Sequence, residues 1–140
     1  MALDAHMVIV GAGLAGARAA AELREAGFRG QVTLLAAEPH APYDRPPLSK
    51  AVLLKEKAPG DCALFASTFF HDHAIDLRLS SAVTKIDRAG RAVQLENGER
   101  IGYSRLLLAT GASPRTLSVP GSALPGVVTL RTADDARQLA

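Results

Sequence analysis

Hydrophobic residues at the start of the chain are spaced as in a strand, a helix and a second strand. Residues 8–10 are an unbroken run of β-forming side chains, which is typical of a parallel strand buried on both faces. Between Gly16 and Gly27, small or apolar residues recur on one helical face, and charged residues share the opposite face. Residues 31–36 predict a second strand. The pattern therefore predicts a βαβ unit.

The middle of the chain predicts several shorter elements. Residues 39–47 contain four prolines and predict a stiff, extended segment, because a residue that precedes proline avoids the helical region. Beyond it, alternating apolar and polar residues around the Asn97-Gly98 turn predict an antiparallel β-meander on the edge of the main sheet. The expected elements are helices over residues 48–54 and 68–74, and strands over 75–79, 83–87, 92–96 and 99–103.

A continuous apolar run at residues 106–108 ends in Ala109, Thr110 and Gly111. It predicts a central parallel strand buried on both faces, whose carboxyl end lies at the edge where open α/β sheets bind ligands. A short strand is expected over residues 127–130. Thr132 is positioned to cap a final helix, which reaches the last residue without a stop signal. We therefore expect the 140 residues to be a piece of a longer protein.

Gly11, Gly13 and Gly16 follow the first strand at the spacing G-x-G-x-x-G. Such glycines permit a tight turn, a close approach of pyrophosphate to the backbone, and close packing of helix on strand, respectively. The helix N-terminus then offers N–H groups and a partial positive charge to phosphates. Glu38 lies 22 residues after Gly16, where a carboxylate can accept hydrogen bonds from ribose hydroxyls. The alternative is a glycine-rich turn of an ordinary α/β protein, with Glu38 an exposed loop carboxylate.

Composition narrows the classes of protein. With 48% hydrophobic and 21% charged residues, the chain can bury a core. A net charge of +2 without a Lys/Arg run gives no indication of nucleic-acid binding, and no apolar run approaches transmembrane length. The single cysteine, Cys62, excludes an intrachain disulfide and favours a reducing, cytoplasmic location. His71 and His73 would point to different faces of a helix, so no metal site is expected.

Three segments together resemble a known family. They are the glycine motif, Arg45-Pro46-Pro47-Leu48-Ser49-Lys50, and Ala109-Thr110-Gly111. With them the chain resembles the N-terminal part of FAD-dependent, NAD(P)H-using ferredoxin and rubredoxin reductases, such as the putidaredoxin-reductase type and the reductases of aromatic-ring dioxygenases. The resemblance implies a Rossmann-like, α/β FAD-binding domain of the pyridine nucleotide-disulfide oxidoreductase type. Residues 1–140 would be its N-terminal part, with the NAD(P)-binding and C-terminal domains outside this chain.

The resemblance also implies which residues bind FAD. Because Ala37 is not acidic, the contact with the adenosine ribose would fall to Glu38. The implied residues are Gly11, Gly13, Leu14, Ala15 and Gly16 at the pyrophosphate, Ala37 and Glu38 at the ribose, Val83 at the adenine through its backbone, Ala109, Thr110 and Gly111 beside the cofactor, and Arg45, Lys50 and Arg131 near the flavin.

Three of these cations also have ordinary interpretations. Lys50, placed near the flavin, would stabilise the negative charge of the reduced ring as the one catalytic residue, helped by the N-terminus of the helix expected over residues 48–54. It could instead be an exposed helix lysine. Arg45 could stack on the flavin or pair with Asp44 or Glu38, and Arg131 could lie on the surface.

The implied function is oxidoreduction. Electrons would pass from NAD(P)H through FAD to a ferredoxin- or rubredoxin-type carrier that feeds an oxygenase, although the 140 residues alone would be inactive. Where disulfide-reducing relatives carry a cysteine pair, this chain has RPPLSK, so electrons should leave the flavin directly. The alternatives are an NADH oxidase, a nitrite-reductase flavin module, an apoptosis-inducing-factor-like flavoprotein, or a non-catalytic nucleotide-binding fragment.

Overall fold

The computed structural model describes residues 5–140, which form two compact units. The first unit contains residues 5–43 and 64–111, and the second contains residues 44–63 and 112–140. Between residues 5 and 140, no helix has both the length and the apolar character needed to cross a membrane.

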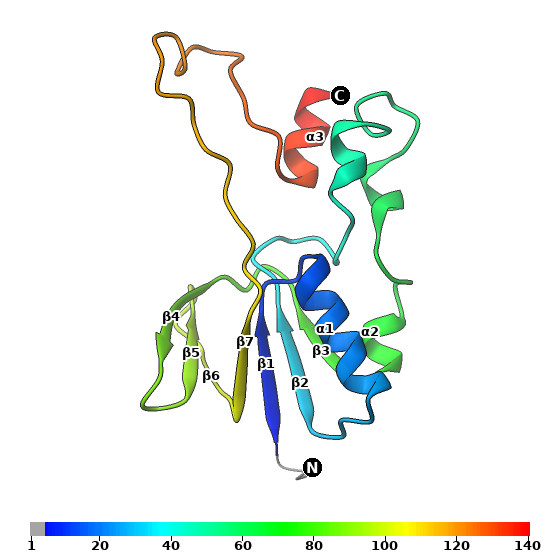
Figure 1. The fold of residues 1–140 in the computed structure, drawn as a ribbon, viewed down its shortest axis with the longest axis vertical. Coiled ribbons are helices and arrows are strands. Elements are labelled where there is room, and N and C mark those ends of the chain that lie inside the picture. Colours follow the sequence, from blue (N-terminus) through cyan, green and yellow to red (C-terminus); the bar gives the residue numbers. More distant parts are fainter. Residues whose placement is uncertain (1–4) are drawn as a thin grey trace. The chain divides into compact units, whose positions relative to one another are not determined.

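The first unit contains two sheets. Four parallel strands lie in the order β3-β2-β1-β7, and three antiparallel strands form a separate sheet in the order β4-β5-β6 (Figure 1). The predicted α/β class, with a parallel sheet and a meander, is confirmed. The elements are β1 (His6–Val10), α1 (Leu14–Glu25), β2 (Gln31–Leu35), α2 (Phe69–Asp72), β3 (Ile75–Arg78), β4 (Val83–Asp87), β5 (Ala92–Leu95), β6 (Arg100–Gly102) and β7 (Arg105–Leu108).

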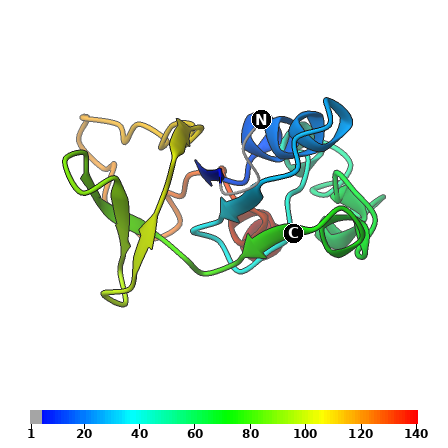
Figure 2. The same cartoon turned by 90° about the horizontal axis from the view of Figure 1, so that it is seen from below.

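Strands β1 and β2 of the parallel sheet are covered on both faces. Successive side chains of a strand point to opposite faces, so Ile9 packs with α1 on one side while Val8 and Val10 pack with the meander on the other. Figure 2 shows α1 and the strands β4–β6 on opposite sides of the sheet. The meander therefore adds a third layer with its own hydrophobic core. The sequence pattern predicts that the meander lies on the edge of the main sheet. This prediction is wrong, because β4, β5 and β6 form a separate sheet.

Helix α1 packs closely because its buried face carries only small residues. Gly16, Ala17, Ala20 and Ala21 are buried, whereas the charged residues of the opposite face are exposed. Small side chains allow the helix backbone to approach the sheet, which places the start of α1 directly beyond the end of β1. The predicted amphipathic helix is thus confirmed.

Strand β7 differs from its prediction. It is parallel to β1, as expected, but among the described residues it forms the edge of the sheet rather than its centre. Leu107 and Leu108 are 38% and 55% exposed, respectively. The prediction of burial on both faces is therefore wrong for this chain, because no described element covers these side chains.

The second unit contains little regular structure. Its elements are two 3₁₀ turns, η1 (Pro46–Ser49) and η2 (Pro59–Cys62), and helix α3 (Ala133–Leu139). The helix predicted over residues 48–54 is wrong: η1 covers its start and non-helical turns follow. The strand predicted over residues 127–130 is also absent, since this stretch lacks a pairing partner among the described residues.

Candidate dinucleotide-binding site

The carboxyl ends of β1, β2 and β7 lie at one edge of the parallel sheet. The chain runs from β1 through β2 to β3 on one side, and β7 pairs with β1 on the other side. The order of the strands therefore reverses between β1 and β7. In open α/β sheets, ligands bind in the crevice beyond such a switch point.

Gly11 makes the turn that leaves β1. Its φ of +103° lies in the region that side chains disfavour, and its N–H donates to the Leu35 carbonyl oxygen over 2.9 Å. A Cβ at this position would collide with the Ala109 carbonyl oxygen and press on Thr110. The structure thus brings together three residues that the sequence assigned to the cofactor site, although they are about 100 residues apart.

Gly16 lies in a crowded environment, whereas Gly13 has open space around its Cα. A Cβ on Gly16 would collide with the Gly11 carbonyl oxygen, so only glycine lets α1 pack at this distance. A Cβ on Gly13 would meet no heavy atom within 4 Å. The fold therefore does not need glycine at position 13. The open space above this backbone is what a pyrophosphate requires for close approach.

The first turn of α1 offers backbone donors to that space. Gly13 is the N-cap residue, it provides no side-chain cap, and the first turn carries no acidic residue. The first backbone bond of the helix runs from the Ala17 N–H to the Gly13 carbonyl oxygen, so the preceding N–H groups lack intrahelical acceptors. Leu14 and Ala15 are exposed. These features fit an anionic phosphate group.

The loop after β2 holds Ala37 and Glu38. Ala37 is exposed, and Glu38 is half-buried. The Tyr43 hydroxyl donates to Oε2 of Glu38 over 2.5 Å, and the Ser80 N–H donates to the Glu38 carbonyl oxygen over 3.1 Å. Tyr43 was not predicted from the sequence as a site residue. Its only signal was an aromatic side chain within the proline-rich segment, five residues after the carboxylate.

Val83 and Gly111 complete the predicted residues of the first unit. Val83 begins β4, pairs with Leu95 and is half-buried against the core beneath the meander. The pairing register shifts between Val83 and Lys85. Gly111 lies in the loop after β7 with a φ of +69°. Contact of either residue with a cofactor stays a prediction.

In the second unit, the predicted residues Arg45 and Arg131 meet. Nη1 of Arg45 donates to the Arg131 carbonyl oxygen over 2.6 Å. The Asp135 carboxylate accepts from the N–H groups of Arg131 and Thr132 over 2.8 and 2.7 Å. These backbone donors at Thr132 and Arg131, with Arg45 nearby, lower the pKa of Asp135. Arg45 therefore ties the proline-rich segment to the start of α3.

Lys50 is exposed at the C-terminal end of η1. The expectation that a helix N-terminus would reinforce its charge is wrong, because no helix begins there. Among residues 5–140, its ammonium group has no hydrogen-bond or ion-pair partner. A role near the flavin stays a prediction for Lys50.

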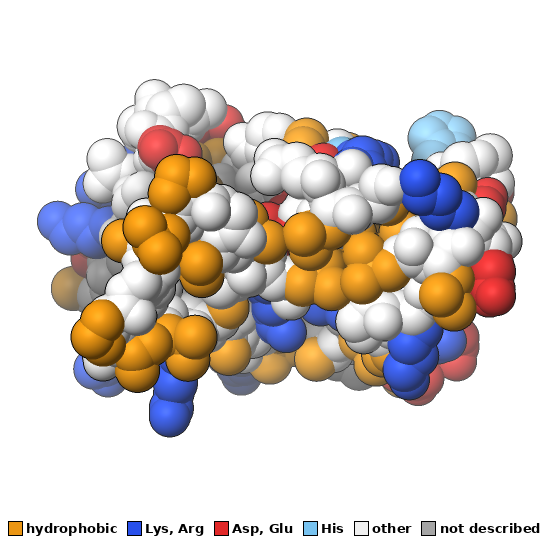
Figure 3. Space-filling view, turned by 90° about the horizontal axis from the view of Figure 1, so that it is seen from above, with side chains coloured by type: hydrophobic (Ala, Val, Ile, Leu, Met, Phe, Trp, Pro, Cys, Tyr) orange, Lys and Arg blue, Asp and Glu red, His pale blue; other side chains and the backbone are white. Residues whose placement is uncertain are grey.

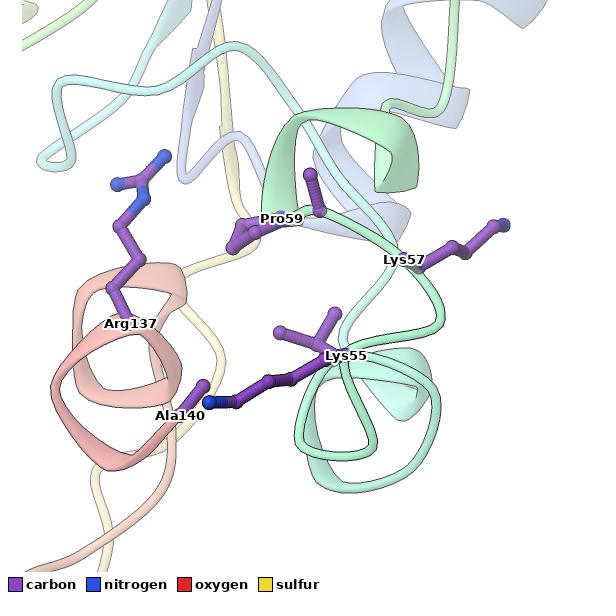
Figure 4. A pocket seen from close by; sticks show the side chains of 7 residues that line it. Lys55, Lys57, Pro59, Arg137 and Ala140 are labelled. Carbon is purple, nitrogen blue, oxygen red and sulfur yellow. The ribbon is translucent and has the colours of Figure 1, made fainter.

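A hollow of about 420 Å³ lies within the second unit (Figure 4). It is lined by Lys55, Lys57, Pro59, Arg137 and Ala140, with two small apolar residues. None of the residues predicted to bind the cofactor lines it.

Neither thiol nor metal chemistry is indicated by the described part of the chain. Cys62 is a buried free thiol, which contacts the Ala58 carbonyl oxygen at 3.8 Å. Within residues 5–140, no three His, Cys, Asp or Glu side chains are grouped so that they could hold a metal ion.

A parallel sheet with a glycine turn at its switch point defines a dinucleotide-binding α/β protein. A family model described as pyridine nucleotide-disulphide oxidoreductase matches residues 5–140. The chain belongs to this family.

Relatives within the family include several reductases. The chain is 47% identical over 133 residues to rhodocoxin reductase of Rhodococcus erythropolis, covering 95% of this chain and 31% of the relative. It is 44% identical to rubredoxin-NAD(+) reductase of Pseudomonas putida, covering 95% and 34%. The crystal structure of a ferredoxin reductase from Rhodopseudomonas palustris superposes with a TM-score of 0.91 at 43% identity, covering 97% and 33%. The chain thus spans about a third of the length of these relatives.

Proposed function

We propose that this chain is the FAD-binding part of an NAD(P)H-dependent oxidoreductase that passes electrons to a ferredoxin- or rubredoxin-type carrier, which feeds an oxygenase. The observation that carries the proposal is the cradle at the switch point: Gly13 has open space above it, and the first turn of α1 carries no acidic residue. The names of the similar reductases support the type of carrier.

The residues of the first unit would hold the nucleotide part of FAD. The backbone from Gly13 to Gly16 would bind the pyrophosphate, Glu38 the adenosine ribose, and Val83 the adenine. Ala109, Thr110 and Gly111 would lie beside the cofactor. When bound, FAD accepts a hydride and releases electrons one at a time, which this protein scaffold itself cannot do.

In the second unit, we propose that Arg45, Lys50 and Arg131 lie near the flavin. The hydrogen bond between Arg45 and the Arg131 carbonyl oxygen would fix the segment that carries Lys50. A lysine ammonium beside the flavin would favour its reduced, negatively charged form. Lys50 is therefore the residue to which we assign an electrostatic role in catalysis.

We propose that electrons leave without a disulfide relay in this segment. Cys62 is buried and is the single cysteine of the sequence, so no thiol pair can form within these residues. This favours a one-electron protein carrier as acceptor. It also accords with a cytoplasmic site of action, where thiols stay reduced.

We also propose that residues 1–140 are the N-terminal part of the FAD-binding domain, with NAD(P)-binding and C-terminal domains in the rest of the protein. The open edge and exposed leucines of β7 support this, because an apolar parallel strand is normally covered. Further hydrophobic side chains are exposed at the surface (Figure 3). In the second unit they include Leu117, Val119, Leu124, Val127 and Val128.

The test is acceptor specificity of the full-length protein. NADH and NADPH would each be supplied with a rubredoxin, a [2Fe–2S] ferredoxin, oxygen or nitrite as the acceptor. Fast reduction of one of the two carrier proteins, with slow use of oxygen and nitrite, is the expected result. Preferential reduction of oxygen or nitrite would contradict the proposal and would favour an NADH oxidase or a nitrite-reductase module.

A further inference from the structure

The side chains of Tyr43 and Glu38 meet in the loop after β2. We propose that Tyr43 is a positioning residue, which holds the Glu38 carboxylate in the orientation that receives the adenosine ribose of FAD. The inference rests on the proposed function, because it adds a residue to the nucleotide site proposed above. It assigns a role to Tyr43, which belongs neither to the glycine motif nor to the acidic position after β2.

The contact between the two side chains is short and directional. The Tyr43 hydroxyl donates to Oε2 of Glu38 over 2.5 Å. Hydroxyl–carboxylate bonds of this length are charge-assisted and stronger than bonds between neutral groups. A carboxylate has about four acceptor positions on two oxygens, so accepting from tyrosine is compatible with accepting from ribose hydroxyls. The bond orients the carboxylate and is compatible with further hydrogen bonds from ribose hydroxyls to the same group.

Both partners are held by the surrounding backbone. Tyr43 is 7% exposed, and the carbonyl oxygen of the preceding Pro42 accepts from the Leu64 N–H over 2.9 Å. The Glu38 carbonyl oxygen accepts from the Ser80 N–H, which connects its loop to the end of β3. Burial of the phenol ring and these backbone hydrogen bonds therefore restrict the movement of both side chains.

Such an arrangement affects binding through preorganisation. A glutamate side chain has three rotatable bonds, and ordering it at the moment of binding reduces affinity. A carboxylate already oriented by a buried tyrosine has lost that freedom before the nucleotide arrives. Removing only the hydroxyl should therefore weaken FAD binding while the ring continues to fill its place in the core.

The experiment compares full-length apoprotein carrying Tyr43→Phe with wild type. FAD dissociation constants are measured by fluorescence titration, and the thermal midpoints of the apoproteins are recorded. We expect Tyr43→Phe to weaken FAD binding about tenfold, close to the lower end of the range for hydrogen bonds to charged groups. Tyr103→Phe is the matched control, since the Tyr103 hydroxyl has no hydrogen-bond partner among residues 5–140. It should leave the dissociation constant unchanged.

A double-mutant cycle with Glu38→Ala separates positioning from general support of the fold. If Tyr43 acts through Glu38, Tyr43→Phe should have no further effect on FAD affinity in the Glu38→Ala protein. An equal loss in both backgrounds would overturn the inference. The inference would also be overturned if Glu38→Ala weakened FAD binding and Tyr43→Phe did not. That result would leave the proposed function intact. Failure of the wild-type protein to bind FAD would overturn the proposed function together with this inference.

Discussion

Gly11, Gly13 and Gly16 occupy three different steric environments. Gly11 needs glycine for its positive φ and for its contact with Ala109, and Gly16 needs it for contact with the Gly11 carbonyl. Gly13 has an ordinary φ of −73° and open space around its Cα. Stability thus explains two of the glycines, and ligand access explains the third.

This difference predicts that alanine substitutions will separate folding from binding. Gly11→Ala and Gly16→Ala should each lower the free energy of unfolding by roughly 2–4 kcal/mol, because the new methyl group meets backbone atoms. Gly13→Ala should change the free energy of unfolding by less than about 1 kcal/mol, because two small effects oppose each other. Alanine is a poorer N-cap residue than glycine, which destabilises the fold, but it lowers the entropy of the unfolded chain, which stabilises the fold. It should nevertheless weaken FAD binding. Urea denaturation and FAD titration measure the two effects.

Gly60→Ala is the control for these substitutions, because a Cβ at Gly60 also meets nothing within 4 Å but lies outside the motif. It should alter neither quantity. A loss of stability in Gly13→Ala equal to that in Gly11→Ala would contradict the assignment of Gly13 to ligand access.

Lys50 is an exposed cation without a partner among residues 5–140. If it lies beside the flavin in the full-length protein, Lys50→Ala should lower the two-electron midpoint potential by about 30 mV, which corresponds to ~1.4 kcal/mol. Lys57→Ala, which removes another exposed lysine of the same unit, should leave the potential unchanged. Spectroelectrochemical titration provides the measurement. Equal potentials for Lys50→Ala and wild type would remove Lys50 from the mechanism.

At the scale of elements, Arg24 joins the end of α1 to two other segments. Its guanidinium donates to the carbonyl oxygens of Phe28 and Gly30 over 2.8 Å each, and to those of His73 and Ala74 over 2.9 and 2.7 Å. Burial and the nearby Arg29 lower the pKa of Arg24, but an arginine remains charged in proteins. One side chain thereby satisfies four carbonyl groups around the entry to β2 and β3.

Arg24→Ala should therefore destabilise the first unit. Hydrogen bonds from a charged donor contribute more than neutral ones, but the site is partly exposed, so we expect a loss of about 2–3 kcal/mol. The measurement is urea denaturation of the 140-residue chain. Arg29→Ala, at a neighbouring exposed arginine, should change stability by less than about 0.5 kcal/mol. Equal effects of the two substitutions would show that Arg24 is not a structural clamp.

Helix α3 is held at its start by a capping box. The Thr132 side chain accepts from the Asp135 N–H, and the Asp135 carboxylate accepts from the backbone of Thr132. These bonds lower the pKa of Asp135 from its usual 3.8. The carboxylate therefore stabilises the folded state above pH about 4, and this contribution disappears as the pH falls through the lowered pKa.

Asp135→Asn should accordingly lower the thermal midpoint near neutral pH, and its difference from wild type should shrink below pH 4. Thermal denaturation of both proteins across this pH range tests the sign. Asp44→Asn is the control, because the Asp44 side chain has no hydrogen-bond or ion-pair partner among residues 5–140. A difference for Asp135→Asn that does not depend on pH would contradict the capping role of the ionised carboxylate.

Across the whole chain, the elements that follow from local sequence patterns were largely predictable. Burial that depends on residues far away in the sequence was not. The βαβ opening was predictable because helical spacing and the glycine motif are local. The apolar run of β7 correctly indicated a parallel strand, but it could not show that the strand lies at the edge of the described sheet with Leu107 and Leu108 exposed. Residues 48–54 looked helical from their side chains alone, yet the two preceding prolines are followed by tight turns.

The candidate site follows the same distinction. Gly11, Gly13, Gly16 and Glu38 were recognisable from spacing. The contact between Tyr43 and Glu38, and that between Arg45 and Arg131, depend on how loops fold back. No periodicity encodes such contacts, so only the three-dimensional structure brings them out.

The central claim is that the backbone at the start of α1 binds FAD in the intact protein. The most direct test is to purify the full-length protein, release its bound nucleotide by denaturation, and identify and quantify it by chromatography. The account predicts FAD at close to one molecule per chain in the wild type and a clearly lower amount in Gly13→Ala. Purified protein that is folded but retains and rebinds no FAD would contradict it.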